Sequence, residues 1–135
     1  MDDDIFDVME WIRYAQEDYD AAVAMAATNN PYAPRKACYD CHQSAEKILK
    51  AYIIAKEGTR KKEHNLVTLL KQCSQYSHDF DGLRAACLIL NTHIAKTRYP
   101  SGKKLTDSDM EEALGEAAKI LELTKSKLTE MGFGS

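Results

Sequence analysis

The chain has 135 residues, a hydrophobic fraction of 44% and a formal net charge of −3 at pH 7, which fits a single domain with a buried core. The overall charge of a negatively charged protein does not attract nucleic acid. Any binding of nucleic acid would therefore depend on a local basic patch. No apolar run approaches the roughly 18 residues that a membrane span needs. The acidic N-terminus is unlike a basic signal peptide, so we expect a soluble, cytoplasmic protein with no membrane association.

Apolar residues recur at spacings of three and four along five segments, which is the spacing of one helix face. We expect one domain over residues 1–135 with its core at about 5–131. The five helices are expected at about 4–27, 34–57, 65–76, 80–96 and 107–131. Short alternating β-branched runs are missing and the connections are short. The predicted fold is therefore all-α, an antiparallel up-and-down bundle of about five helices.

The expected helix ends carry residues that stop or cap helices. Asn29-Asn30-Pro31 stops the first helix, and Gly58 lies where a left-handed C-cap would end the second. The candidates for side-chain caps are Asp79 or Asp81 for the fourth helix and Thr106 or Asp107 for the fifth. Gly82 lies within the first turn expected for the fourth helix and makes its start less certain than the other helix ends.

The second helix has a regular apolar face, formed by Cys38, Cys41, Ala45, Ile48, Leu49 and Tyr52. Beside this face lie His42, Lys47 and Lys50, which together would form a polar groove for an anionic ligand. In the alternative interpretation, His42 is a partly buried histidine that is hydrogen-bonded within the bundle. Glu46 and Lys50, four residues apart in the favourable order, would then only brace the helix surface.

Four cysteines lie on apolar helix faces: Cys38, Cys41, Cys73 and Cys87. Cys38 to His42 matches C-x-x-C-H, the attachment pattern of haem c, but it lies inside a strong helix of a chain without a signal peptide. A redox Cys-x-x-Cys site, and a zinc site that adds His42 and Cys73 or Cys87, are weaker alternatives. We expect reduced thiols that pack as small apolar groups, and no metal site.

A basic cluster follows the fourth helix, with Arg98 and Lys103 on either side of a Pro- and Gly-containing loop. Arg98 and Lys103 would bind phosphate oxygens, and Tyr99 would stack on a base. Alternatively, this loop is simply solvated, or Arg98 forms an ion pair with Asp18 or Glu46. A second cluster after the second helix is expected to be a solvated loop; it consists of Arg60, Lys61, Lys62 and His64.

Several short motifs occur in order along nearly the whole chain. They are W-x3-A-x2-D-x3-A from Trp11, HQ-x-AEK from His42, HNL from His64 and RYP from Arg98. This ordered set resembles the HEPN (higher eukaryotes and prokaryotes nucleotide-binding) domain family. The resemblance implies an up-and-down helical bundle that is usually dimeric and is often encoded beside a minimal nucleotidyltransferase in a toxin–antitoxin pair. Some members are metal-independent ribonucleases, and others bind nucleotides or only pair with partners.

The resemblance also implies where a ribonuclease site would lie. Ribonuclease members carry Arg-x4-6-His, in which the histidine is the acid or base and the arginine steadies the phosphate. The matching arginine here is Arg98, but the positions where a histidine is needed hold Lys103, Lys104 and Leu105. Arg35 and His42 also fit the bare pattern, but they lie on the second helix, in the wrong place. The catalytic motif is therefore incomplete.

The sequence predicts a nucleotide- or RNA-associated binding module that forms a homodimer, pairs with a nucleotidyltransferase partner in a toxin–antitoxin-type system and needs no cofactor. The predicted phosphate- and nucleotide-binding residues are His42, Lys47, Lys50, Arg98, Tyr99 and Lys103. One alternative is an endoribonuclease that uses Arg98 with a histidine from elsewhere, such as His42, His64 or His93. The other is a helical interaction module without a ligand.

Overall fold

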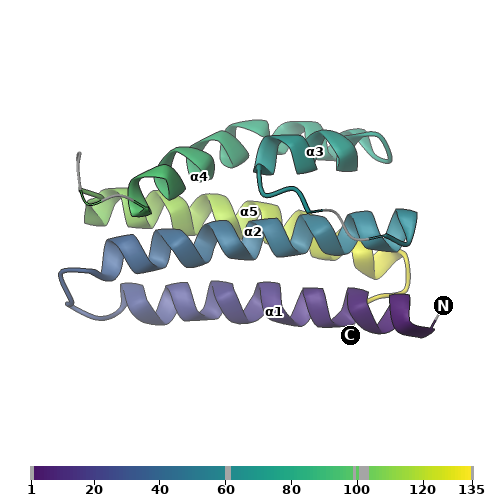
Figure 1. The fold of residues 1–135 in the computed structure, drawn as a ribbon, viewed down its shortest axis with the longest axis horizontal. Coiled ribbons are helices and arrows are strands. Elements are labelled where there is room, and N and C mark those ends of the chain that lie inside the picture. The colour runs from purple at the N-terminus through teal and green to yellow at the C-terminus, as the bar shows by residue number, and fades with distance from the viewer. Residues whose placement is uncertain (1, 60–61, 99, 101–103, 135) are drawn as a thin grey trace.

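The computed structural model describes residues 2–59, 62–98, 100 and 104–134, and for residues 2–6 only the backbone. Its helices are α1 (Asp2–Ala26), α2 (Ala33–Glu57), α3 (Leu66–Ser74), the short 3₁₀ helix η1 (His78–Leu83), α4 (Arg84–Thr97) and α5 (Asp107–Glu130). No strand occurs among these residues. The predicted all-α bundle is confirmed, and each of its five long helices lies close to its expected position (Figure 1).

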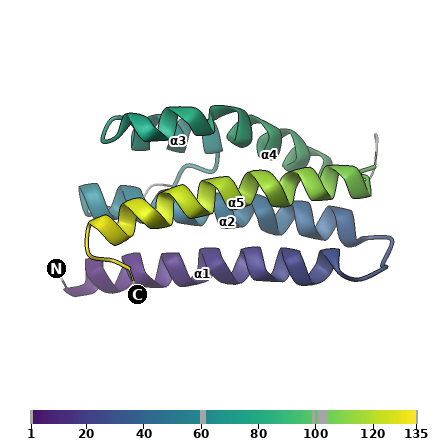
Figure 2. The same ribbon diagram turned by 180° about the vertical axis from the view of Figure 1, so that it is seen from behind.

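The helices form an elongated bundle in which α2 and α5 lie between α1 on one side and α3 with α4 on the other (Figures 1 and 2). Helix α2 contacts all four of the other α-helices. The start of α1 and the end of α5 lie at one end of the bundle, and the end of α4 and the start of α5 lie at the opposite end. Within the described residues, no helix combines the length and the apolar character that crossing a bilayer requires.

The core is a single cluster of buried side chains drawn from every helix, and the expected apolar faces supply most of it. All of the predicted inward residues of α3 are buried, from Leu66 to Cys73. Phe80 of η1 is fully buried and its ring lies 4.7 Å from that of Tyr52, centre to centre. Ile120 of α5 is also fully buried.

Three helix ends have the caps that their sequence indicates. Gly58 has a φ of +75°, and its N–H donates to Ile54 O at 2.7 Å, as expected of a left-handed C-cap. The side chain of Asn65 accepts from the first N–H groups of α3. Thr106 and Asp109 form a reciprocal capping box at the start of α5, which confirms Thr106 as the cap.

The start of the fourth helix differs from the prediction. Residues from His78 to Leu83 form the 3₁₀ helix, and α4 begins only at Arg84 with no side-chain cap. Ser77, rather than Asp79 or Asp81, supplies the cap, and it caps the 3₁₀ helix. Gly82 gives this segment a low helix propensity, which favours a short 3₁₀ turn over an early start of the α-helix.

Candidate functional site

A row of three polar side chains runs along α2. His42, Glu46 and Lys50 are spaced four residues apart, which places them on one helix face. All three are buried, with exposed fractions of 3%, 6% and 4%. Charged side chains are seldom buried to this degree unless they are paired, so the partners of this row decide what it can do.

Glu46 is the centre of the row. Its Oε2 accepts from Lys50 Nζ at 2.9 Å and lies 3.0 Å from His64 Nδ1, while its Oε1 lies 3.9 Å from His42 Nδ1. Lys50 Nζ also lies 5.9 Å from the centre of the Trp11 ring. The alternative interpretation placed the Glu46–Lys50 pair on the helix surface, but the structure buries this pair. The charge of Lys50 is thus already balanced by Glu46.

His42 is the least exposed member of the row. Its Nδ1 has no hydrogen-bond partner among the described residues. Burial lowers the pKa of His42, while the charge of Glu46 and the neighbouring amides of Gln43 and Asn91 act in the opposite direction. The charge of Arg98 lowers this pKa further. His42 is therefore held as a neutral imidazole at neutral pH, with one ring nitrogen unused.

Arg98 is the exposed residue that follows the last turn of α4. Its positive charge is the smallest of the causes that act on the pKa of His42, a residue far away in the sequence. Two ion pairs were considered for it, with Asp18 and with Glu46. Each of these carboxylates has another cationic partner. Within the described part of the chain, Arg98 takes part in no ion pair.

Lys47 points away from the row toward α1. Its Nζ donates to Asp18 Oδ2 at 2.6 Å and lies 5.8 Å from the centre of the Tyr14 ring. Lys47 therefore ties α2 to α1 and does not share a groove with His42. Two other predicted site residues, Tyr99 and Lys103, fall outside the residues that the structure describes, so their predicted roles stay predictions.

Two contributors to this region were not predicted. Asn91 of α4 lies beside His42, and it also donates to the capping side chain of Asn65 at 3.2 Å. His64 lies in an exposed loop, as predicted, and its Nδ1 also contacts the buried Glu46. Both come from segments that only the tertiary fold brings to α2. The only local indication was that His64 directly precedes Asn65, the N-cap of α3, and so lies close to the start of a helix.

The four cysteines behave as the packing interpretation predicts. All are buried and free. Burial raises the pKa of Cys38, Cys41 and Cys87 to about 12 and that of Cys73 well above its usual range. Thiols with such pKa values are protonated at neutral pH, and redox or metal chemistry needs the thiolate.

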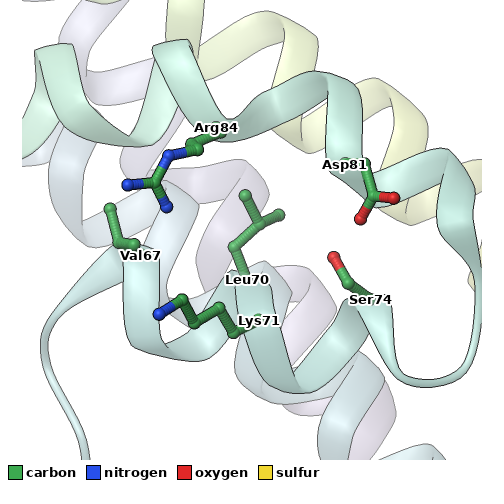
Figure 3. Close-up of a pocket in the computed structure, with 6 residues that line it drawn as sticks. All are labelled: Val67, Leu70, Lys71, Ser74, Asp81 and Arg84. Atoms are coloured by element: carbon green, nitrogen blue, oxygen red, sulfur yellow. The ribbon is translucent and has the colours of Figure 1, made fainter.

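An open pocket of about 250 Å³ lies between α3, η1 and the start of α4 (Figure 3). Its lining residues are Val67, Leu70, Lys71, Ser74, Asp81 and Arg84. Figure 3 shows the Arg84 and Lys71 side chains on one side of Leu70, and Ser74 and Asp81 facing each other on the other. None of the predicted site residues lines this pocket.

The chain matches one protein family and is similar in fold to solved structures. The HEPN domain family matches residues 8–127 of the chain. The crystal structure of TT1696 from Thermus thermophilus superposes with a TM-score of 0.78 at 25% identity, covering 89% of this chain and 97% of that one. ST0689, an archaeal HEPN homologue, superposes with a TM-score of 0.70 at 23% identity, covering 89% and 96%. No curated protein matches the chain.

Proposed function

The chain belongs to the HEPN domain family, and from this premise we propose that it is a binding module for a nucleotide or a short stretch of RNA. The phosphate is bound at the end of α4 by Arg98. This assignment depends on one observation: Arg98 is exposed and in no ion pair with a described residue, next to a neutral, buried His42 whose Nδ1 is unused.

Arg98 is the strongest phosphate ligand among the predicted residues because its guanidinium is available. A guanidinium presents a planar fork of donors that matches two phosphate oxygens. Lys47 and Lys50 would each have to leave a carboxylate before they could bind an anion. We therefore give these two lysines a supporting role at most. Tyr99 and Lys103, which follow Arg98 in the sequence, are proposed to add base stacking and a further positive charge.

The test is binding of a labelled nucleoside triphosphate and of a short single-stranded RNA, at two salt concentrations. We expect Arg98→Ala to weaken binding about tenfold or more and to reduce its salt dependence, because one phosphate contact is lost. Arg84→Ala is the matched control, since Arg84 is an exposed arginine at the other end of the same helix. Equal affinities of the wild type and Arg98→Ala would contradict the proposal.

A second candidate function is RNA cleavage that uses Arg98 with His42. The charge of Arg98 acts on His42, and the lowered pKa of His42 keeps the imidazole in the neutral form that a base needs. Because the ring is buried, a 2′-hydroxyl reaches it only if the bundle opens at His42. Cleavage products are read in the same binding assays. In this case Arg98→Ala and His42→Gln would both abolish cleavage, whereas binding without cleavage supports the module alone.

We further propose that the module works as a homodimer and pairs with a nucleotidyltransferase partner, as part of a toxin–antitoxin-type system. Membership of the family supports this proposal. Co-expression with the product of a neighbouring nucleotidyltransferase gene, followed by co-purification under a tag on the partner only, tests it. Recovery of the tagged partner alone would count against the pairing.

A further inference from the structure

We propose that His93, Asp109 and Glu112 form a binding site for a divalent transition-metal ion of the Zn²⁺ or Mn²⁺ class. His93 comes from α4 and the two acids come from the first turns of α5. One ligand atom from each lies within 4.8 Å of the others. The site is separate from the proposed phosphate site at Arg98 and shares no residue with it.

His93 is the buried member of the proposed site. His93 is only 5% exposed, and its Nε2 lies 2.9 Å from Glu112 Oε1. Its other ring nitrogen, Nδ1, is buried and has no hydrogen-bond partner among the described residues. The contact with Glu112 points the Nε2 edge of a buried ring at the carboxylates. An ionised carboxylate only accepts, so Nε2 carries the hydrogen in this contact; a metal ion at Nε2 takes the place of that hydrogen, and the neutral ring then carries its proton on Nδ1.

Asp109 is held in a fixed orientation by the capping box of α5. Its Oδ2 accepts from the backbone N–H of Thr106 at 2.9 Å, and its own N–H donates to Thr106 Oγ1 at 3.1 Å. Metal-binding carboxylates are commonly oriented by such second hydrogen bonds. The capping box thus fixes the Asp109 carboxylate at the start of α5, on the side of the helix that faces His93.

Glu112 leaves the site open to solvent. Its side chain is 50% exposed, in contrast to His93. Three protein ligands with one open side leave room for water molecules to complete the coordination of the ion. The ligand set of one imidazole and two carboxylates suits Zn²⁺ and Mn²⁺ better than Ca²⁺ or Mg²⁺, which prefer oxygen ligands alone.

Calorimetric titration of the full chain with Zn²⁺ and with Mn²⁺ tests the site. We expect one ion per chain in the wild type and an affinity lower by about tenfold or more in Glu112→Gln. Because Glu112 is half exposed, this variant should fold. Glu111→Gln is the matched control, an exposed neighbour on the same helix. His64→Gln, which changes a histidine–carboxylate contact elsewhere in the bundle, should also bind like the wild type.

Two further readouts locate the ion. Zn²⁺ should raise the melting temperature of the wild type and Glu111→Gln but not that of Glu112→Gln. Mn²⁺ should broaden the ring signals of His93 in the NMR spectrum and leave those of the exposed His78 sharp. The proposal is overturned if the wild type takes up no ion, or if Glu112→Gln and the wild type bind equally well.

Discussion

At the scale of single residues, the feature that most needs explanation is the burial of Glu46 among three basic groups. A carboxylate and an ammonium removed from water are stable only when each compensates the other, and the 2.9 Å contact between Glu46 and Lys50 does this. His64 adds a second partner at the solvent side of the same carboxylate. Replacing only Glu46 or only Lys50 should therefore lower the free energy of unfolding more than replacing both with uncharged residues.

We expect Glu46→Gln to lower the free energy of unfolding by about 3 kcal/mol, because Lys50 is left as an unpaired buried charge. The double variant Glu46→Gln/Lys50→Met should lose clearly less than the sum of the two single variants. Urea denaturation measures all three. The partly exposed pair of Asp18 and Lys47 is the comparison, for which we expect a coupling of at most about 1 kcal/mol. Strictly additive losses for Glu46 and Lys50 would contradict the pairing argument.

His42 should make the protein less stable as the pH falls. Its pKa in the folded protein is below the ordinary value of about 6.5, so the unfolded chain binds a proton at a higher pH than the folded protein does. The neutral His42 ring makes its full contribution to the free energy of unfolding above about pH 6.5. This contribution is lost as the pH falls toward the pKa of His42 in the folded protein. We expect His42→Gln to flatten the decline in unfolding free energy between about pH 7 and 5.

His78→Gln is the control for this pH effect, because the His78 side chain is 96% exposed. The His78→Gln variant should show the same decline in unfolding free energy with falling pH as the wild type. An identical pH dependence in His42→Gln and the wild type would show that the buried ring is not responsible.

At the scale of helices, two glycines differ in whether their backbone conformation tolerates a side chain. Gly115 lies inside α5 with open space where a Cβ would be, while Gly58 ends α2 with a φ of +75°. Gly115→Ala should stabilise the protein by up to about 1 kcal/mol through helix propensity. Gly58→Ala should destabilise it by about 1 kcal/mol or more, because a side chain is strained in the left-handed region. Thermal unfolding of both variants measures the two effects, and a shift in the same direction for both would contradict this account.

Helix faces and most helix ends could be predicted because they depend on residues close in sequence. The spacing of Leu66, Leu69 and Cys73 fixes which side of α3 is buried, and Gly58 or Thr106 marks an end without reference to the rest of the fold. The contact of His64 with Glu46 could not be predicted, because it depends on how a connection crosses a neighbouring helix. For the same reason, the sequence left Lys47 and Lys50 available for a ligand, whereas the fold pairs both.

At the scale of the whole molecule, self-association depends on surfaces that the single chain leaves uncovered. Leu88 of α4 is 45% exposed, so the single chain leaves a large apolar side chain of this helix uncovered. We expect the wild type to have the mass of a dimer in light scattering after size-exclusion chromatography, and Leu88→Glu to have that of a monomer. Val23→Glu, which changes a residue of α1 with the same 45% exposure, should remain dimeric. A monomeric wild type, or a dimeric Leu88→Glu, would contradict this arrangement.

The start of α1 and the end of α5 lie at the same end of the bundle, opposite to the end of α4 and the start of α5 (Figures 1 and 2). Any anchoring group attached to either terminus is therefore held away from Arg98 by the length of the bundle. A protein immobilised on a bead or sensor through a terminal tag keeps its Arg98 end directed into solution. Genetic fusion of a second domain to either terminus should, in the same way, leave the Arg98 end of the bundle unobstructed.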